Sequence, residues 1–222
     1  MKNIAKTFAV AVLGALMIVG TASAADFSPE MTFELSDARV KANPQLKVHL
    51  EQDDNEEELG TVTLKIPAGF KLPADAAIPN NDQLGSGTIN IHAGPGCQPG
   101  QEALPTAPVT APATLVEQDR TDEQIDNGVL AVWNLDISGV TEVPLVITGS
   151  KAVGFTLYGE IAPNANTCPP FSFDLNVNSQ AASGVPLLIN PKKPGKKKFT
   201  ASLTSIDSPA VVDIKQVIKI TK

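Results

Sequence analysis

Histidine and cysteine, the side chains on which most metal sites and many catalytic sites depend, are scarce in this sequence. Its 222 residues include 2 His and 2 Cys, together with 1 Trp and 1 Tyr. The cysteines lack the CxxC spacing of a zinc or redox motif, and no G-x-S-x-G nucleophile elbow occurs. We therefore expect no metal site and no catalytic residues, and we expect that the protein is not an enzyme.

The two histidines, His49 and His92, each fall on the polar side of a run of alternating apolar and polar residues. Histidines in such positions are usually solvated residues of a strand face. Zinc binding would require a third ligand beside them, and the sequence offers no obvious one. A catalytic triad can assemble from residues far apart in sequence, so a secreted hydrolase with a site hidden by the fold remains an alternative.

Long apolar runs are absent after the first 24 residues. A short basic start is followed by the apolar stretch 8–20 and by the small residues of "ASA" at 22–24, which is the pattern of a signal peptide. We expect 1–24 to be removed on export and the mature chain, 25–222, to be extracellular. No later run is long enough to predict a transmembrane segment.

Positive charge is also in short supply. The signal peptide takes two lysines with it, so the mature chain has 15 Lys and Arg against 24 Asp and Glu, a net charge of −9 compared with −7 for the whole sequence. Binding to nucleic acids needs basic surface that displaces counterions, and this balance argues against it.

The two cysteines, Cys97 and Cys168, both lie in Gly-, Pro- and Asn-rich surroundings, "AGPGCQPG" and "NANTCPPF". In an exported chain such a pair indicates one disulfide between two irregular connections. In the chain-entropy model, closing so long a loop stabilises the fold by about 3–5 kcal/mol.

Alternating apolar and polar residues recur along the mature chain, which predicts half-buried strands. The main candidates are 31–35, 45–50, 61–66, 88–92, 129–137, 153–161, 171–177, 185–190, 198–203 and 211–220. Asn127-Gly128 precedes one of them and is a strong hairpin signal. About eleven short strands separated by turn residues predict an all-β fold, an antiparallel immunoglobulin-like β-sandwich.

The Pro-rich stretch 99–114 is either a long surface loop or a linker. The predicted disulfide would span it, which favours a single β-sandwich domain over 25–222. Two small β modules divided near 98–114 are the alternative.

Several segments together resemble a group of secreted actinobacterial β-sandwich proteins of uncharacterised function. They are "NPQLKV" (43–48), "VTLKIPAGF" (62–70), "LGSGTI" (84–89) and "GVPLLINPKKPGKKKFTASLTS" (184–205). The resemblance implies an exported β-sandwich, and it implies no activity because no catalytic residue belongs to these motifs.

Two acidic segments, 51–58 and 119–128, invite a calcium interpretation. Asp53, Asn55 and Glu57 alternate as at the start of an EF-hand loop, but Glu58 occupies the position that requires glycine. Solvated loops are therefore the simpler interpretation. No cofactor is expected, with calcium as the alternative.

A basic cluster interrupts this acidic chain in the segment "NPKKPGKKKF". It contains Lys192, Lys193, Lys196, Lys197 and Lys198. Pro194-Gly195 suits a type II turn, which predicts a hairpin loop between 185–190 and 198–203 with the lysines at its tip. The cluster is either a solvated turn or a contact to an anionic surface.

Together these features predict a secreted, non-catalytic structural or adhesive protein that acts at or beyond the cell envelope. Its partner would be an anionic cell-surface polymer or another protein. A calcium- or ligand-binding β module and a secreted hydrolase are the two alternatives.

Overall fold

The computed structural model describes residues 27–53, 57–73, 77–92, 108–138, 141–161, 171–206 and 208–222, with only the backbone of His92 and Pro108. The predicted signal peptide and both cysteines of the predicted disulfide lie outside these ranges. Within them, no helix has the length and apolar character needed to cross a bilayer.

The residues in these ranges form an all-β structure of eleven antiparallel strands with one short helix. The strands are β1 (Glu30–Leu35), β2 (Leu46–Glu51), β3 (Leu59–Ile66), β4 (Gln83–His92), β5 (Pro108–Gln118), β6 (Val129–Ile137), β7 (Thr141–Ser150), β8 (Gly154–Glu160), β9 (Ser172–Val177), β10 (Gly195–Ser205) and β11 (Val211–Ile220), and the helix is α1 (Asp122–Asp126).

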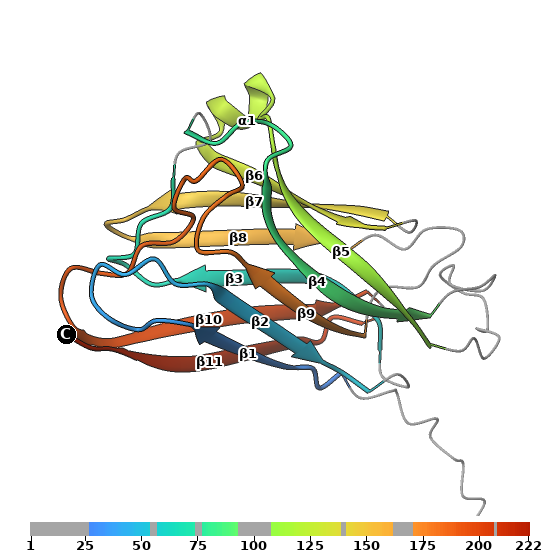
Figure 1. The fold of residues 1–222 in the computed structure, drawn as a ribbon. Coiled ribbons are helices and arrows are strands. Elements are labelled where there is room, and N and C mark those ends of the chain that lie inside the picture. Colours follow the sequence, from blue (N-terminus) through green and yellow to red (C-terminus); the bar gives the residue numbers. More distant parts are fainter. Residues whose placement is uncertain are drawn as a thin grey trace, which may run out of the picture.

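All strands belong to one hydrogen-bonded sheet with the order β1-β2-β9-β4-β5-β6-β7-β8-β3-β10-β11. The sheet rolls up, so that β1, β2, β9, β4 and β5 cross in front of β7, β8, β3 and β10 (Figure 1). The prediction of an all-β fold with about eleven antiparallel strands is therefore confirmed. The two halves are continuous through β5 and β6 and are not two separate sheets.

Proline explains why the sequence does not reveal β5 and β7. Proline has no N–H for a ladder, so it usually marks the end of a strand. Pro112 pairs with Thr88 of β4, but the pairing of β5 with β6 begins only at Ala113. In the same way, Pro144 pairs with β6 and lies just before the start of the pairing with β8. Each proline therefore lies just outside one of its two ladders, although the Pro112 carbonyl still accepts from the Ser138 N–H.

The two edges of the sheet, β1 and β11, meet along a seam. The side chain of Gln216 on β11 accepts from the Phe33 N–H at 2.7 Å and donates to the Phe33 carbonyl at 2.7 Å. Beyond the strands, Val40 donates to the Thr221 carbonyl and Thr221 donates to the Ala38 carbonyl. Side-chain and backbone hydrogen bonds thus join edges that would otherwise expose unpaired groups.

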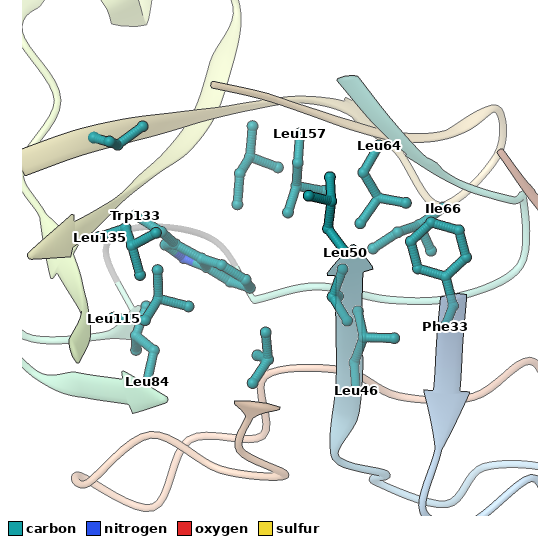
Figure 2. Packing of buried hydrophobic residues seen from close by; sticks show 14 of the residues in the cluster. Phe33, Leu46, Leu50, Leu64, Ile66, Leu84, Leu115, Trp133, Leu135 and Leu157 are labelled. Carbon is teal, nitrogen blue, oxygen red and sulfur yellow. The ribbon is translucent and has the colours of Figure 1, made fainter. Parts of the chain in front are cut away.

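One apolar core fills the rolled sheet. Figure 2 shows Trp133, Leu135 and Leu115 facing Leu157 and Leu64 across it. A cavity of about 60 Å³, lined by apolar side chains and Gly159, remains between the halves.

Three phenylalanines fill the end of the core at which the C-terminus lies. Phe33 of β1 stacks on Phe199 of β10 with ring centroids 5.9 Å apart, and Phe70 meets Phe199 edge-on at 5.3 Å. All three are essentially inaccessible to solvent. Leu187 and Leu188 are also buried.

The segment 185–190, predicted as a strand, is instead irregular and forms isolated bridges, Gln180 with Pro186 and Lys71 with Ile189. The apolar run in this segment was misleading, because the adjacent Leu187 and Leu188 are both buried. Adjacent residues of a half-buried strand would point to opposite faces. This segment covers the end of the core.

The turn predicted at Asn127-Gly128 is also different. Thr121 caps α1 through the Gln124 N–H, and the Gln124 side chain accepts from the Thr121 N–H, which makes a capping box. Gly128 has a φ of +74°, whereas Asn127 has a φ of −81°. A two-residue I′ turn needs positive φ at both positions, so the pair instead ends a helix.

Glycine in "LGSGTI" allows β4 to curve closely over β9, and Figure 1 shows this curve. A Cβ added at Gly87 would overlap the carbonyl oxygen of Asp174, and one at Gly85 would overlap that of Asn176.

We expect Gly87→Ala to separate β4 from β9 and to lower the free energy of unfolding by several kcal/mol, because the obstructing atoms belong to the backbone. Urea unfolding measures this loss, and an unchanged midpoint would contradict it.

The seam gives a second prediction. Gln216→Ala removes both side-chain bonds to Phe33 and should lower the free energy of unfolding by about 1–3 kcal/mol. The neighbouring Lys215 points to solvent, and Lys215→Ala should change it by less than about 0.5 kcal/mol. Equal effects of the two substitutions in urea unfolding would show that the amide does not hold the seam.

Candidate functional site

Backbone hydrogen bonds and strand pairing bring lysines from five separate parts of the sequence to the end of the sheet where β11 ends. Figure 1 marks the C-terminus at this end. We call this surface the lysine end. Its residues are Lys41, Lys71, Lys151, Lys192, Lys193, Lys196, Lys197, Lys219 and Lys222. All are exposed except Lys197, which is half-buried.

Backbone hydrogen bonds hold the loops of the lysine end together. Lys71 and Ile189 exchange two bonds, of 3.0 and 2.9 Å, and Gly69 donates to the Lys151 carbonyl at 2.9 Å. Lys41 donates to the Pro191 carbonyl at 3.3 Å. The lysines therefore belong to one cross-linked surface.

Asn190 fastens this surface to the rest of the chain. Its side-chain amide is buried and donates to the carbonyls of Asp37 and Arg39, both at 2.8 Å. Its backbone N–H donates to the Ala42 carbonyl. Because a buried amide must satisfy its donors, Asn190 fixes how the loop before β2 lies against 184–194.

Only one carboxylate side chain occurs in the segments that form the lysine end (36–44, 67–73, 149–154, 184–197 and 217–222), and it belongs to Asp37. Arg39 pairs with it at 2.6 Å. Side-chain and backbone hydrogen bonds from Arg39 lower the pKa of Asp37 to about 2. The lysines make no ion pair within the described residues. Their charges are not neutralised there by neighbouring carboxylates.

Four of the five lysines of the predicted basic cluster belong to this surface and Lys198 borders it on β10, but they do not form the tip of a hairpin. Lys192 and Lys193 lie in the bend before β10, while Lys196, Lys197 and Lys198 are within β10 and pair with β11. Gly195 has a φ of +146° and begins the strand, unlike the roughly +80° of a type II turn. The lysines therefore alternate between the two faces of a strand.

That alternation separates one lysine from the others. Lys197 turns toward the loop after β3 and its ammonium donates to the Ala68 carbonyl at 2.8 Å. Lys196 and Lys198 are exposed. Lys197 thus has a structural contact, whereas its neighbours present their charges to solvent.

A second polar feature lies on the outer face of β1, β2 and β9. It is a hollow of about 430 Å³ that contains His49 beside Asp174. His49 Nδ1 lies 2.7 Å from Asp174 Oδ1, and His49 Nε2 lies 3.7 Å from Glu51 Oε2. The hydrogen bond to Asp174 raises the pKa of His49 above its usual value, while partial burial opposes this and Glu51 adds to it.

This hollow tests the hydrolase alternative, because a hydrolase site would be expected in a cleft that contains a histidine beside an acid. Thr32 is directly opposite His49 on β1 and supplies the nearest hydroxyl in register. Yet the imidazole nitrogen that remains for catalysis, Nε2, faces a carboxylate. Backbone N–H groups in the middle of a sheet are used by the ladders, so they supply no oxyanion hole. The arrangement suits binding better than acyl transfer.

No group of three His, Cys, Asp or Glu side chains comes together as a metal site in the part of the chain that the structure describes. Residues 54–56 of the first acidic segment lie outside that part, as do Cys97, Cys168 and the side chain of His92. Calcium binding and the disulfide stay predictions. In the second acidic segment, Asp122 and Glu123 form the first turn of α1, where negative charge favours a helix.

Comparison with known proteins finds no match among family models, curated proteins or solved structures.

The His49–Asp174 pair predicts a pH-dependent contribution to stability. Because the folded-state pKa of His49 is raised, this contribution is complete below the unfolded pKa of about 6.5 and is lost as the pH rises through the folded value. Asp174→Asn should therefore shift the urea midpoint more at pH 5 than at pH 9. Asp136 is exposed on β6 and faces no histidine across the β5 or β7 pairing, and Asp136→Asn should show no such trend. A shift by Asp174→Asn that is the same at all pH values would contradict the assignment.

Proposed function

We propose that the protein is exported and acts without catalysis, binding an anionic polymer of the cell envelope through its lysine end. The observation that carries the proposal is the convergence of nine of the chain's 17 Lys and Arg residues on a surface whose described segments contain one carboxylate side chain, Asp37, which is already paired. Folding alone does not require lysines here, because loops that cover a core need only polar side chains of any kind on their outer surface.

The distribution of charge over the molecule would orient the protein toward a polyanion as well as attract it. Glu51 ends β2, and Glu57 and Glu58 precede β3, so they lie at the end of the sheet opposite the lysine end. A chain with this separation of charge turns its basic end toward a polyanion as it approaches. The negative net charge meanwhile disfavours contact through the rest of the surface.

The use of lysine as the basic side chain favours binding of a flexible polymer over binding of a ligand with a fixed shape. Lysine is a compact point charge on a flexible stem, whereas arginine gives fixed, bidentate geometry, and the lysine end uses lysine. Lys196 and Lys198 lie two residues apart on one side of β10, about 7 Å by the rise of a strand. That spacing suits successive charges along a phosphate-bearing chain.

A lipid surface is a weaker match for the same charges. Proteins that lie on bilayers add large apolar side chains to their basic residues. Among the described residues of the lysine end, two large apolar side chains are strongly exposed, those of Val153 and Val217, and neither is aromatic. The proposal therefore commits to a polymer.

The architecture is compatible with this role. The two halves of the rolled sheet face each other across one core and present loops at both ends, as immunoglobulin-like sandwiches do when their end loops bind partners. We propose that the fold is related in architecture to the immunoglobulin-like β-sandwich.

The test is binding of the mature protein to soluble polyphosphate and to envelopes from its source, over a range of salt concentrations. Lys192→Ser, Lys193→Ser and Lys196→Ser combined should reduce the slope of log K against log salt by about one per lysine that contacts the polymer. The matched control combines Lys47→Ser, Lys65→Ser and Lys215→Ser, which removes the same charge from the sides of the sheet and should retain most of the binding to polyphosphate.

Two outcomes would refute the proposal. One is an absence of salt-dependent binding to both polyphosphate and envelopes by the wild-type protein. The other is an equal loss in the two triple variants, which would mean that total charge and not the lysine end governs attachment.

A further inference from the structure

The hollow on the outer face of β1, β2 and β9 is separate from the lysine end and has a different chemistry. Its polar lining comes from Thr32, Glu34, Lys47, His49, Asp174 and Asn176. Its volume of about 430 Å³ lies within the range of small-molecule sites.

The strand register arranges these six side chains in two rows. Thr32, His49 and Asp174 are directly opposite one another on β1, β2 and β9. In the next row, Glu34, Lys47 and Asn176 are likewise aligned. Neighbouring strands are about 4.8 Å apart, so the rows form a compact grid of donors and acceptors.

The second row keeps its hydrogen-bonding groups available. Glu34 and Lys47 carry opposite charges at directly paired positions, yet they form no ion pair in the described part of the chain. Both are exposed, and Asn176 beside them is half-buried. In the first row, by contrast, His49 and Asp174 hold each other at 2.7 Å. One row is rigid and the other is free to contact a ligand.

We propose that this hollow binds an uncharged oligosaccharide. Acidic and basic side chains alternate within one strand spacing, so a ligand with a strong charge of either sign would meet repulsion as well as attraction. A sugar hydroxyl instead donates to a carboxylate and accepts from an ammonium or amide at the same time, and vicinal hydroxyls repeat this pattern at short intervals.

The surface continues beyond the hollow in a way that fits a chain of sugar residues. Asn176 pairs with Ser86 of β4, and Asp174 pairs with Thr88. Both of these β4 residues are exposed.

Further along, a network of short hydrogen bonds orders the same outer face. Asn90 donates to Ser172 Oγ at 2.7 Å and accepts from Thr110 Oγ1 at 2.6 Å. A row of small hydroxyl and amide side chains therefore extends from β9 across β4 to β5. Hydroxyls and amides held in fixed positions lose little entropy when they bind, which favours recognition of a polar ligand.

The experiment follows amide resonances of the ¹⁵N-labelled mature protein while maltotetraose, cellotetraose and chitotetraose are added separately. At least one of these tetrasaccharides should shift the resonances of 32–34, 47–49 and 174–176 in a saturable manner. The double variant Glu34→Gln with Lys47→Gln keeps the net charge and a polar side chain at both positions, and it should weaken binding about tenfold. A matched charge-neutral control, Asp213→Asn with Lys215→Gln on β11, should bind as the wild type does.

The inference fails if none of the three tetrasaccharides shifts these resonances, or if the Glu34/Lys47 variant binds as tightly as the wild type. It does not rest on attachment through the lysine end. The Glu34/Lys47 variant should bind polyphosphate normally, and the variant lacking Lys192, Lys193 and Lys196 should bind the tetrasaccharide normally, so that failure of one proposal leaves the other intact.

Discussion

Closure of the sheet between β1 and β11 is the constraint on which the rest of the structure depends. An eleven-stranded open sheet would leave two edges and a wide apolar face exposed to water. The Gln216 amide bonds to both backbone groups of Phe33, and in the ladder Gln216 pairs with Phe199. Phe33 and Phe199 stack directly beneath this seam. Hydrogen bonding at the edge and packing in the core therefore support each other at one place.

A rolled sheet has open ends, and covering them shapes the functional surface. At the end near the C-terminus, Phe70 and Leu187 fill the opening from loops that carry no regular structure. Those loops must turn polar groups outward and satisfy their own backbone, which the bonds between Lys71 and Ile189 and the Asn190 side chain do. The need for a polar outer surface explains its exposure, but not the choice of lysine almost throughout. That choice is the basis of the proposed contact with an anionic polymer.

The sequence reveals strands where one side of the chain is apolar and hides them where other forces act. The runs around Phe33, Val48 and Phe173 alternate cleanly and became strands. Prolines concealed β5 and β7, because the sequence does not show that Pro112 and Pro144 lie beside gaps in the pairing. The lysines of 192–198 were visible as a cluster, whereas Lys41, Lys71 and Lys151 join them only through loop packing. Likewise, His49 and Asp174 are 125 residues apart, and only the β2–β9 pairing brings them together.

The two proposed sites occupy different parts of the same closed sheet, and this separation has a consequence for how the protein would work. The lysine end covers the opening of the sheet, while the row from Glu34 to Asn176 lies along its side wall. A polymer held at the end by diffuse charge would leave the wall accessible, because strand side chains stand roughly perpendicular to the sheet. The first attachment would then place the second site at a high effective concentration near the same envelope. On these two proposals, two weak contacts of different chemistry, one sensitive to salt and one not, would give firm attachment without a deep pocket.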